Sequence, residues 1–135
     1  MRQTMRKLIL VLLLFISYSA WADKHYGTKW VWVAGTIEGD AYYIDPATIR
    51  KEGTLRKYWK LADLKAPNKN GDMSWRVREE LDCKKERYRI TSLTTFSDSM
   101  IKGRITGNYN IPNDEWSDIA PGTLDDYVMK YVCNR

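Results

Sequence analysis

Few residues in this 135-residue chain have the chemistry of a metal ligand or a general acid–base. It has one histidine, His25, and two cysteines, Cys83 and Cys133. A structural zinc site needs about four closely spaced Cys or His ligands, and histidine is the commonest general acid–base. Asp63 and Asp82 are candidate carboxylates, but nothing in the sequence places them as a catalytic pair. The sequence therefore predicts no enzyme, no metal site and no cofactor.

Binding chemistry is better represented, because the chain contains 6 Trp, 9 Tyr and 2 Phe. Alternate residues of a strand point to opposite faces of a sheet. Where a helix covers one face, one member of each adjacent aromatic pair must therefore point to the uncovered face. We interpret such rings, with the arginines of a charged strand face, as a binding surface. Core packing or burial against a second copy of the chain is the alternative for the rings, and a solvated face with cross-strand ion pairs is the alternative for the arginines. The candidates are Tyr42, Tyr58, Trp59, Arg76, Arg78, Arg87 and Arg89.

Residues 1–22 resemble a cleaved secretory signal. Three basic residues precede the apolar run from Leu8 to Ile16, and Ala20-Trp21-Ala22 provides small residues for cleavage. This run is far shorter than the roughly 20 residues of a transmembrane helix. We expect a mature, exported domain of residues 23–135 without a membrane span. No cysteine lies at the cleavage point, so a lipid anchor is not expected.

Removal of this segment changes what the charge implies. The full chain has 22 Lys and Arg against 17 Asp and Glu, and residues 23–135 retain 19 against 17. A balance of +2 is too small to predict a nucleic-acid partner, which needs a basic stripe. In an oxidising compartment, a lone cysteine pair predicts a disulfide between Cys83 and Cys133.

The hydrophobic pattern predicts an α+β fold, an antiparallel sheet of about six strands with one C-terminal helix packed on one face and tethered by the disulfide. Asp45 before Pro46 predicts one short helical turn that Gly53 closes. The expected strands are residues 30–34, 41–44, 54–64, 73–83, 86–97 and 100–109, and the helix is 123–132.

Two details of this pattern can be checked directly. A hairpin closing at Lys84 and Lys85 would place Asp82 opposite Arg87, Glu80 opposite Arg89 and Leu81 opposite Tyr88, and Glu79 alone interrupts the apolar face of the first strand. The helix should bury Leu124, Tyr127, Val128 and Tyr131. Cys133 lies off this stripe, so we expect the last helical turn to unwind.

Aromatic and cysteine motifs follow one another in a distinctive order across residues 30–133: Tyr42-Tyr43-Ile44-Asp45-Pro46, Tyr58-Trp59-Lys60-Leu61-Ala62-Asp63, Glu80-Leu81-Asp82-Cys83, Arg87-Tyr88-Arg89, Ile119-Ala120-Pro121-Gly122 and Val132-Cys133, with Trp30, Gly53 and Trp116. In this order and spacing the chain resembles the surface-adhesin protein E family. This resemblance implies an exported bacterial domain that binds host extracellular-matrix proteins. Our leading hypothesis is therefore a non-enzymatic exported binding domain, periplasmic or at the cell surface, with a protein partner. The alternative is a soluble periplasmic module that binds a small ligand, a glycan or an envelope protein.

Overall fold

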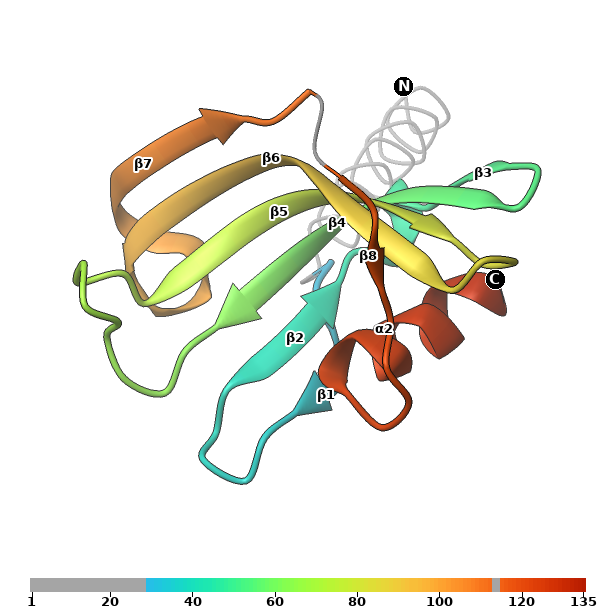
Figure 1. Ribbon diagram of the computed structural model, residues 1–135. Coiled ribbons are helices and arrows are strands. Elements are labelled where there is room, and N and C mark those ends of the chain that lie inside the picture. The colour runs from blue at the N-terminus through green and yellow to red at the C-terminus, as the bar shows by residue number, and fades with distance from the viewer. Residues whose placement is uncertain (1–28, 113–114) are drawn as a thin grey trace, which may run out of the picture.

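The computed structural model describes residues 29–112 and 115–135, so the predicted signal segment and His25 lie outside the described residues. An antiparallel sheet forms the body of the domain, in the order β1-β2-β4-β5-β6-β7 (Figure 1). This arrangement confirms the expected fold class. Two short strands lie off this path: β3 (Arg50–Glu52) pairs with β4 and β8 (Ser117–Asp118) pairs with β6. The strands of the main path are β1 (Val31–Gly35), β2 (Ala41–Ile44), β4 (Leu55–Asp63), β5 (Ser74–Asp82), β6 (Arg87–Asp98) and β7 (Lys102–Asn110).

The predicted helical turn is present as a 3-10 helix, η2 (Pro46–Thr48). The side chain of Asp45 accepts a hydrogen bond from the backbone N–H of Ala47 at 3.2 Å, and proline occupies the first helical position. The turn ends before Gly53, because Ile49 is extended and β3 follows as a hairpin with β4. Gly53, at φ +58°, takes the left-handed conformation in that hairpin turn instead.

The hairpin between β5 and β6 has the register that the charge pattern predicts. The Asp82 carboxylate accepts hydrogen bonds from the backbone N–H groups of Lys84 and Lys85, both at 3.1 Å. Glu86 completes the turn with a positive φ of 51°. The aspartate satisfies the free amides of a tight turn that contains no glycine. The observed pairs are Asp82 with Arg87, Leu81 with Tyr88 and Glu80 with Arg89.

Helix α2 (Leu124–Cys133) packs on one face of the sheet, beside β1 and β2 (Figure 1). The predicted buried stripe is partly wrong, because Tyr127 is 52% exposed. The helix is rotated so that Val128, Met129 and Val132 face the sheet. Burial of these apolar side chains leaves no hydrogen-bonding group unsatisfied. The core cluster consists of these three residues with Ile44, Tyr58 and Leu81.

The predicted disulfide joins Cys83, just after β5, to Cys133 at the end of α2, with 5.9 Å between the Cα atoms. The expected unwinding of the last helical turn is wrong, since α2 continues to Cys133. Cys133 lies one turn after the buried Met129, so the rotated helix presents it to the sheet without distortion. No helix in residues 29–112 and 115–135 is long and apolar enough to span a membrane.

The start of α2 is capped on both sides. The hydroxyl of Thr123 accepts a hydrogen bond from the Asp126 backbone N–H at 3.3 Å. The Asp126 carboxylate in turn accepts one from the Gly122 backbone N–H at 2.9 Å and one from Lys130 at 3.1 Å. The hydrogen bond from Gly122 and the contact with Lys130 hold the pKa of Asp126 below its usual value. The helix is therefore fixed at both ends, by this cap and by the disulfide.

Candidate functional site

The side chains of β4 alternate between two chemically different faces of the sheet. Tyr58 belongs to the core with α2, and Lys60 forms an ion pair with Asp125 of α2, so both lie on the helix face. Trp59 stands between them and points to the opposite face. We call this opposite surface the second face and define it by Trp59, Arg76, Arg78, Arg87 and Arg89.

The ring of Trp59 lies close to two guanidinium groups on the second face. The Arg76 guanidinium carbon is 5.6 Å from the Trp59 ring centroid, and that of Arg78, the cross-strand partner of Trp59, is 5.9 Å away. Arg76 also lies 5.7 Å from the ring of Phe96. In the described part of the chain neither arginine forms an ion pair, and the buried Nε of Arg76 has no hydrogen-bond partner. The rings orient the two cations and leave their N–H groups available to a partner.

Two shallow hollows border Trp59, with volumes of about 180 and 260 Å³. Thr48 of η2 lines both of them. Its hydroxyl accepts a hydrogen bond from the Trp59 backbone N–H at 3.0 Å and donates one to the Asp45 carbonyl at 2.7 Å. The short helix is thus fixed to β4 and forms a rigid rim beside the exposed edge of the indole.

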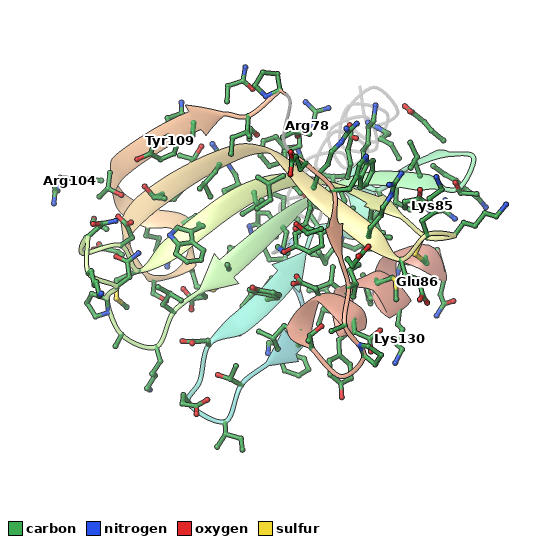
Figure 2. All side chains as sticks on the ribbon, viewed as in Figure 1. Arg78, Lys85, Glu86, Arg104, Tyr109 and Lys130 are labelled. Atoms are coloured by element: carbon green, nitrogen blue, oxygen red, sulfur yellow. A yellow bond between two sulfur atoms is a disulfide. The ribbon has the colours of Figure 1, made fainter. Side chains whose placement is uncertain are left out.

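The other end of the second face is neutralised by its own carboxylates. Arg87 and Arg89 stack on the ring of Trp116, at 4.6 and 4.4 Å from its centroid. Arg89 also pairs with Glu80 at 2.7 Å, and Arg87 with Asp82 at 3.6 Å. Both arginines at this end therefore have a carboxylate partner, whereas Arg76 and Arg78 have none among the described residues. Figure 2 shows Arg78 near the upper part of the view, well apart from Lys130 on α2.

The remaining predicted binding residues, Tyr42 and Tyr58, lie on the helix face. Tyr58 is only 2% exposed, and its hydroxyl donates a hydrogen bond to Glu79 at 2.5 Å. The ring of Tyr42 lies 4.4 Å from the Lys60 Nζ atom. The structure therefore brings five of the seven candidates together on the second face and separates these two tyrosines from them.

The helix face carries a buried ionic network that sequence reasoning did not identify. Lys60 Nζ lies 2.8 Å from Glu79 and 3.7 Å from Asp125, and the Lys60 and Glu79 side chains are only 5% and 1% exposed. Burial alone would lower the pKa of Lys60, but Glu79, Tyr42 and Asp125 together outweigh it and raise the pKa above the ordinary lysine value. Burial and the same carboxylate raise the pKa of Tyr58. Lys60 is therefore protonated at neutral pH.

The carboxylates considered for catalysis have structural roles. Asp63 accepts hydrogen bonds at 2.8 Å from the Ser99 hydroxyl and the Met100 backbone N–H, in the 3-10 helix η3 (Ser99–Ile101). Asp82 caps the β5–β6 turn, and the turn amides of Lys85 and Lys84, with Arg87, lower its pKa. The two aspartates lie at opposite ends of the β4–β5 ladder. Residues 29–112 and 115–135 contain no group of three His, Cys, Asp or Glu side chains that could hold a metal ion.

Comparison with known proteins agrees with this architecture. The model of the surface-adhesin protein E family matches residues 30–134. The chain belongs to this family. Crystal form II of Haemophilus influenzae protein E superposes with a TM-score of 0.62 and 13% identity, covering 79% of this chain and 88% of that one. The selenomethionine form of the same protein gives 0.61 and 12%, covering 79% and 87%. No curated protein matches this chain in sequence.

Within the adhesin E family fold, the structure adds residues to those expected from the sequence. Lys60, Glu79 and Asp125 were missed, although Glu79 is the one residue that interrupts the apolar alternation of β5. A charged residue on a predicted core face needs a buried partner, and this requirement alone would have directed attention to it. Trp116 stacks over two arginines from outside the main path of the sheet, and no local pattern predicts that contact.

Proposed function

We propose that this chain is a non-enzymatic exported binding domain that contacts a host extracellular-matrix protein through its second face. The observation that carries the proposal is the contact of the Trp59 ring with Arg76 and Arg78, whose guanidinium groups have no carboxylate partner in the described part of the chain. Membership of the adhesin E family supports an adhesive role.

The chemistry of the second face favours an acidic protein segment as the partner. Guanidinium groups bind carboxylates through two parallel hydrogen bonds, and tryptophan and arginine are enriched among residues that dominate protein interfaces. The indole stacks with the cations and provides apolar contact area, and the hollows beside it can accept a side chain of the partner. Because Trp59 and both arginines stand on paired strands, little ordering is required on binding.

The test measures binding of the processed chain to immobilised laminin and vitronectin. We expect saturable binding that is at least tenfold weaker in the double variant Arg76→Ala/Arg78→Ala. The matched control is Lys102→Ala/Arg104→Ala, which removes the same charge from exposed β7. Figure 2 shows Arg104 on that edge strand.

Three results would contradict the proposal. The first is the absence of saturable binding beyond that of a heat-denatured sample. The second is equal weakening by both double variants, which would mean a nonspecific charge effect. The third, from light scattering, is a wild-type dimer that the Arg76→Ala/Arg78→Ala variant dissociates, since the second face would then bind another copy of the chain.

Surface display is the cellular part of the proposal. Intact cells are treated with protease, and the chain is followed by antibody beside a periplasmic marker. Digestion while the marker is protected supports display. Protection until the outer membrane is opened would leave the chain with a periplasmic envelope protein as its partner and would refute contact with host proteins.

A further inference from the structure

A cavity of about 190 Å³ lies on the helix face, between the sheet and the start of α2. Its walls include the rings of Tyr42, Trp75 and Tyr88, from three different strands, and aliphatic side chains close to them. Drug-sized ligands occupy pockets of roughly 300–1,000 Å³, so this cavity has room for a single ring or a similarly small group. It is separate from the second face, because its lining residues alternate with those of that face along the strands.

Polar groups with unused hydrogen-bonding capacity surround this apolar space. Lys60 has three N–H groups, and its hydrogen bond in the described part of the chain is to Glu79 at 2.8 Å. The hydroxyls of Tyr42 and Tyr88 form no hydrogen bond with any residue that the structure describes. Asp125, 29% exposed at its side chain, lies 3.7 Å from Lys60 and accepts no hydrogen bond from described residues. Donors and an acceptor therefore meet at the same cavity.

The charges at the cavity select against a strongly ionic ligand. A carboxylate ligand would approach Lys60 only beside the carboxylates of Glu79 and Asp125. An ammonium ligand would meet the Lys60 cation, which already lies 4.4 Å from the Tyr42 ring and 5.9 Å from the Tyr88 ring. Hydroxyl groups both donate and accept hydrogen bonds and bring no charge, so they match this set of partners.

We propose that this cavity binds one neutral, hydroxyl-rich ring, namely a monosaccharide unit of a glycan. The polarised C–H groups on the face of a pyranose pack against the electron-rich faces of aromatic rings. The hydroxyls at its edge would accept from Lys60 and the tyrosines and donate to Asp125. The cavity and the second face would then give the domain two binding sites with different ligands.

The experiment titrates glucose, galactose and N-acetylglucosamine into the processed chain, with tryptophan fluorescence and saturation-transfer NMR as readouts. Glucosamine and glucuronate serve as charged probes that keep the pyranose ring. We expect saturable binding of at least one neutral sugar, at least fivefold tighter than either charged probe. The double variant Tyr42→Phe/Tyr88→Phe keeps the rings and removes the hydroxyls, and we expect it to weaken binding at least tenfold.

Two controls make the result specific. Tyr127→Phe removes a hydroxyl from the exposed face of α2, and Arg76→Ala/Arg78→Ala alters the second face; neither should change sugar affinity. Melting temperatures of all variants establish that they fold. A Kd of ~1 mM is the weak end of specific affinity. The proposal would be overturned if no neutral sugar bound saturably at concentrations up to about 50 times that value. Preference for a charged probe, or equal weakening by Tyr127→Phe, would overturn it too.

Discussion

Removal of Glu79 should show how much the buried ionic network contributes to the free energy of unfolding. Glu79→Leu leaves the Lys60 ammonium buried without its carboxylate, 2.8 Å away in the wild type, and frees the Tyr58 hydroxyl from its acceptor. Both charged side chains are at most 5% exposed, so solvent does not screen the loss. Removal of one partner of a buried pair costs about 3–5 kcal/mol. Lys60→Met should also be destabilising, because it leaves a buried carboxylate with one hydroxyl donor.

The double variant Lys60→Met/Glu79→Leu separates pairing from packing. Apolar residues of similar volume in place of both charges should cost about 1–3 kcal/mol, because the buried Tyr58 hydroxyl still lacks its acceptor, and this cost lies below the sum of the single changes. Urea unfolding followed by circular dichroism at pH 7 measures all four proteins. Additive single and double effects would refute the assignment of the pair as a coupled unit.

The pH dependence provides an independent test of the same network. In the wild type the raised pKa of Lys60 contributes stability that is complete below the unfolded pKa of about 10.4 and is lost as pH rises through the folded value. The raised pKa of Tyr58 has the same sign. In Glu79→Leu, only the Asp125 carboxylate, 3.7 Å away, remains to oppose burial, so the folded pKa of Lys60 should fall and stability should rise with pH toward about 10.4. Parallel profiles for the two proteins between pH 8 and 10 would contradict this reasoning.

Two further predictions concern the ends of α2. Cys83→Ser opens a disulfide with a sequence separation of 50 residues, a loss that costs about 4 kcal/mol on the loop-entropy model. The melting temperature of this variant should therefore lie near that of the reduced wild type. Equal melting temperatures of the oxidised and reduced wild type would show that the bridge contributes nothing. Asp126 has a lowered pKa because of its bonds to Gly122 and Lys130, so its contribution is present above the unfolded pKa of about 4 and is lost as pH falls through the folded value. Asp126→Asn should therefore flatten the loss of stability toward pH 2 in urea titrations, whereas Asp118→Asn, on exposed β8, should leave the profile unchanged.

The sequence predicts the sheet well because its strands alternate in charge and apolarity over long runs. The β5–β6 register follows from opposite charges that face each other, such as Asp82 with Arg87, and a slip of one residue would break every pair. Beyond Arg78 the ladder shifts by a bulge at Arg78 and Glu79, which no cross-strand pattern in the sequence indicates. The helix was placed correctly and rotated incorrectly, because Tyr127 satisfies the apolar spacing while its hydroxyl favours the surface.

The sequence predicts only part of the candidate site, because strand alternation gives the face of each side chain but not its partner. Alternation assigns Trp59 and the arginines to one face, but Tyr58 was included as a binding residue because its ring type, rather than its partner, was read from the sequence. The partner is Glu79, 21 residues away, and only the folded sheet brings the two side chains together. Long-range contacts of this kind leave no periodic trace, apart from a polar residue at an otherwise apolar position.

The two faces of β4 depend on each other through the backbone. Tyr58 and Lys60 both bond to Glu79, at 2.5 and 2.8 Å, so the strand on either side of Trp59 is fixed from the helix face. The Thr48 hydroxyl fixes the Trp59 backbone N–H from η2. A side chain held by such neighbours loses little freedom when a partner binds, so more of the contact energy remains as affinity. The buried network, although it lies on the helix face, thus preorganises the indole and the adjacent arginines for the binding that we propose on the second face.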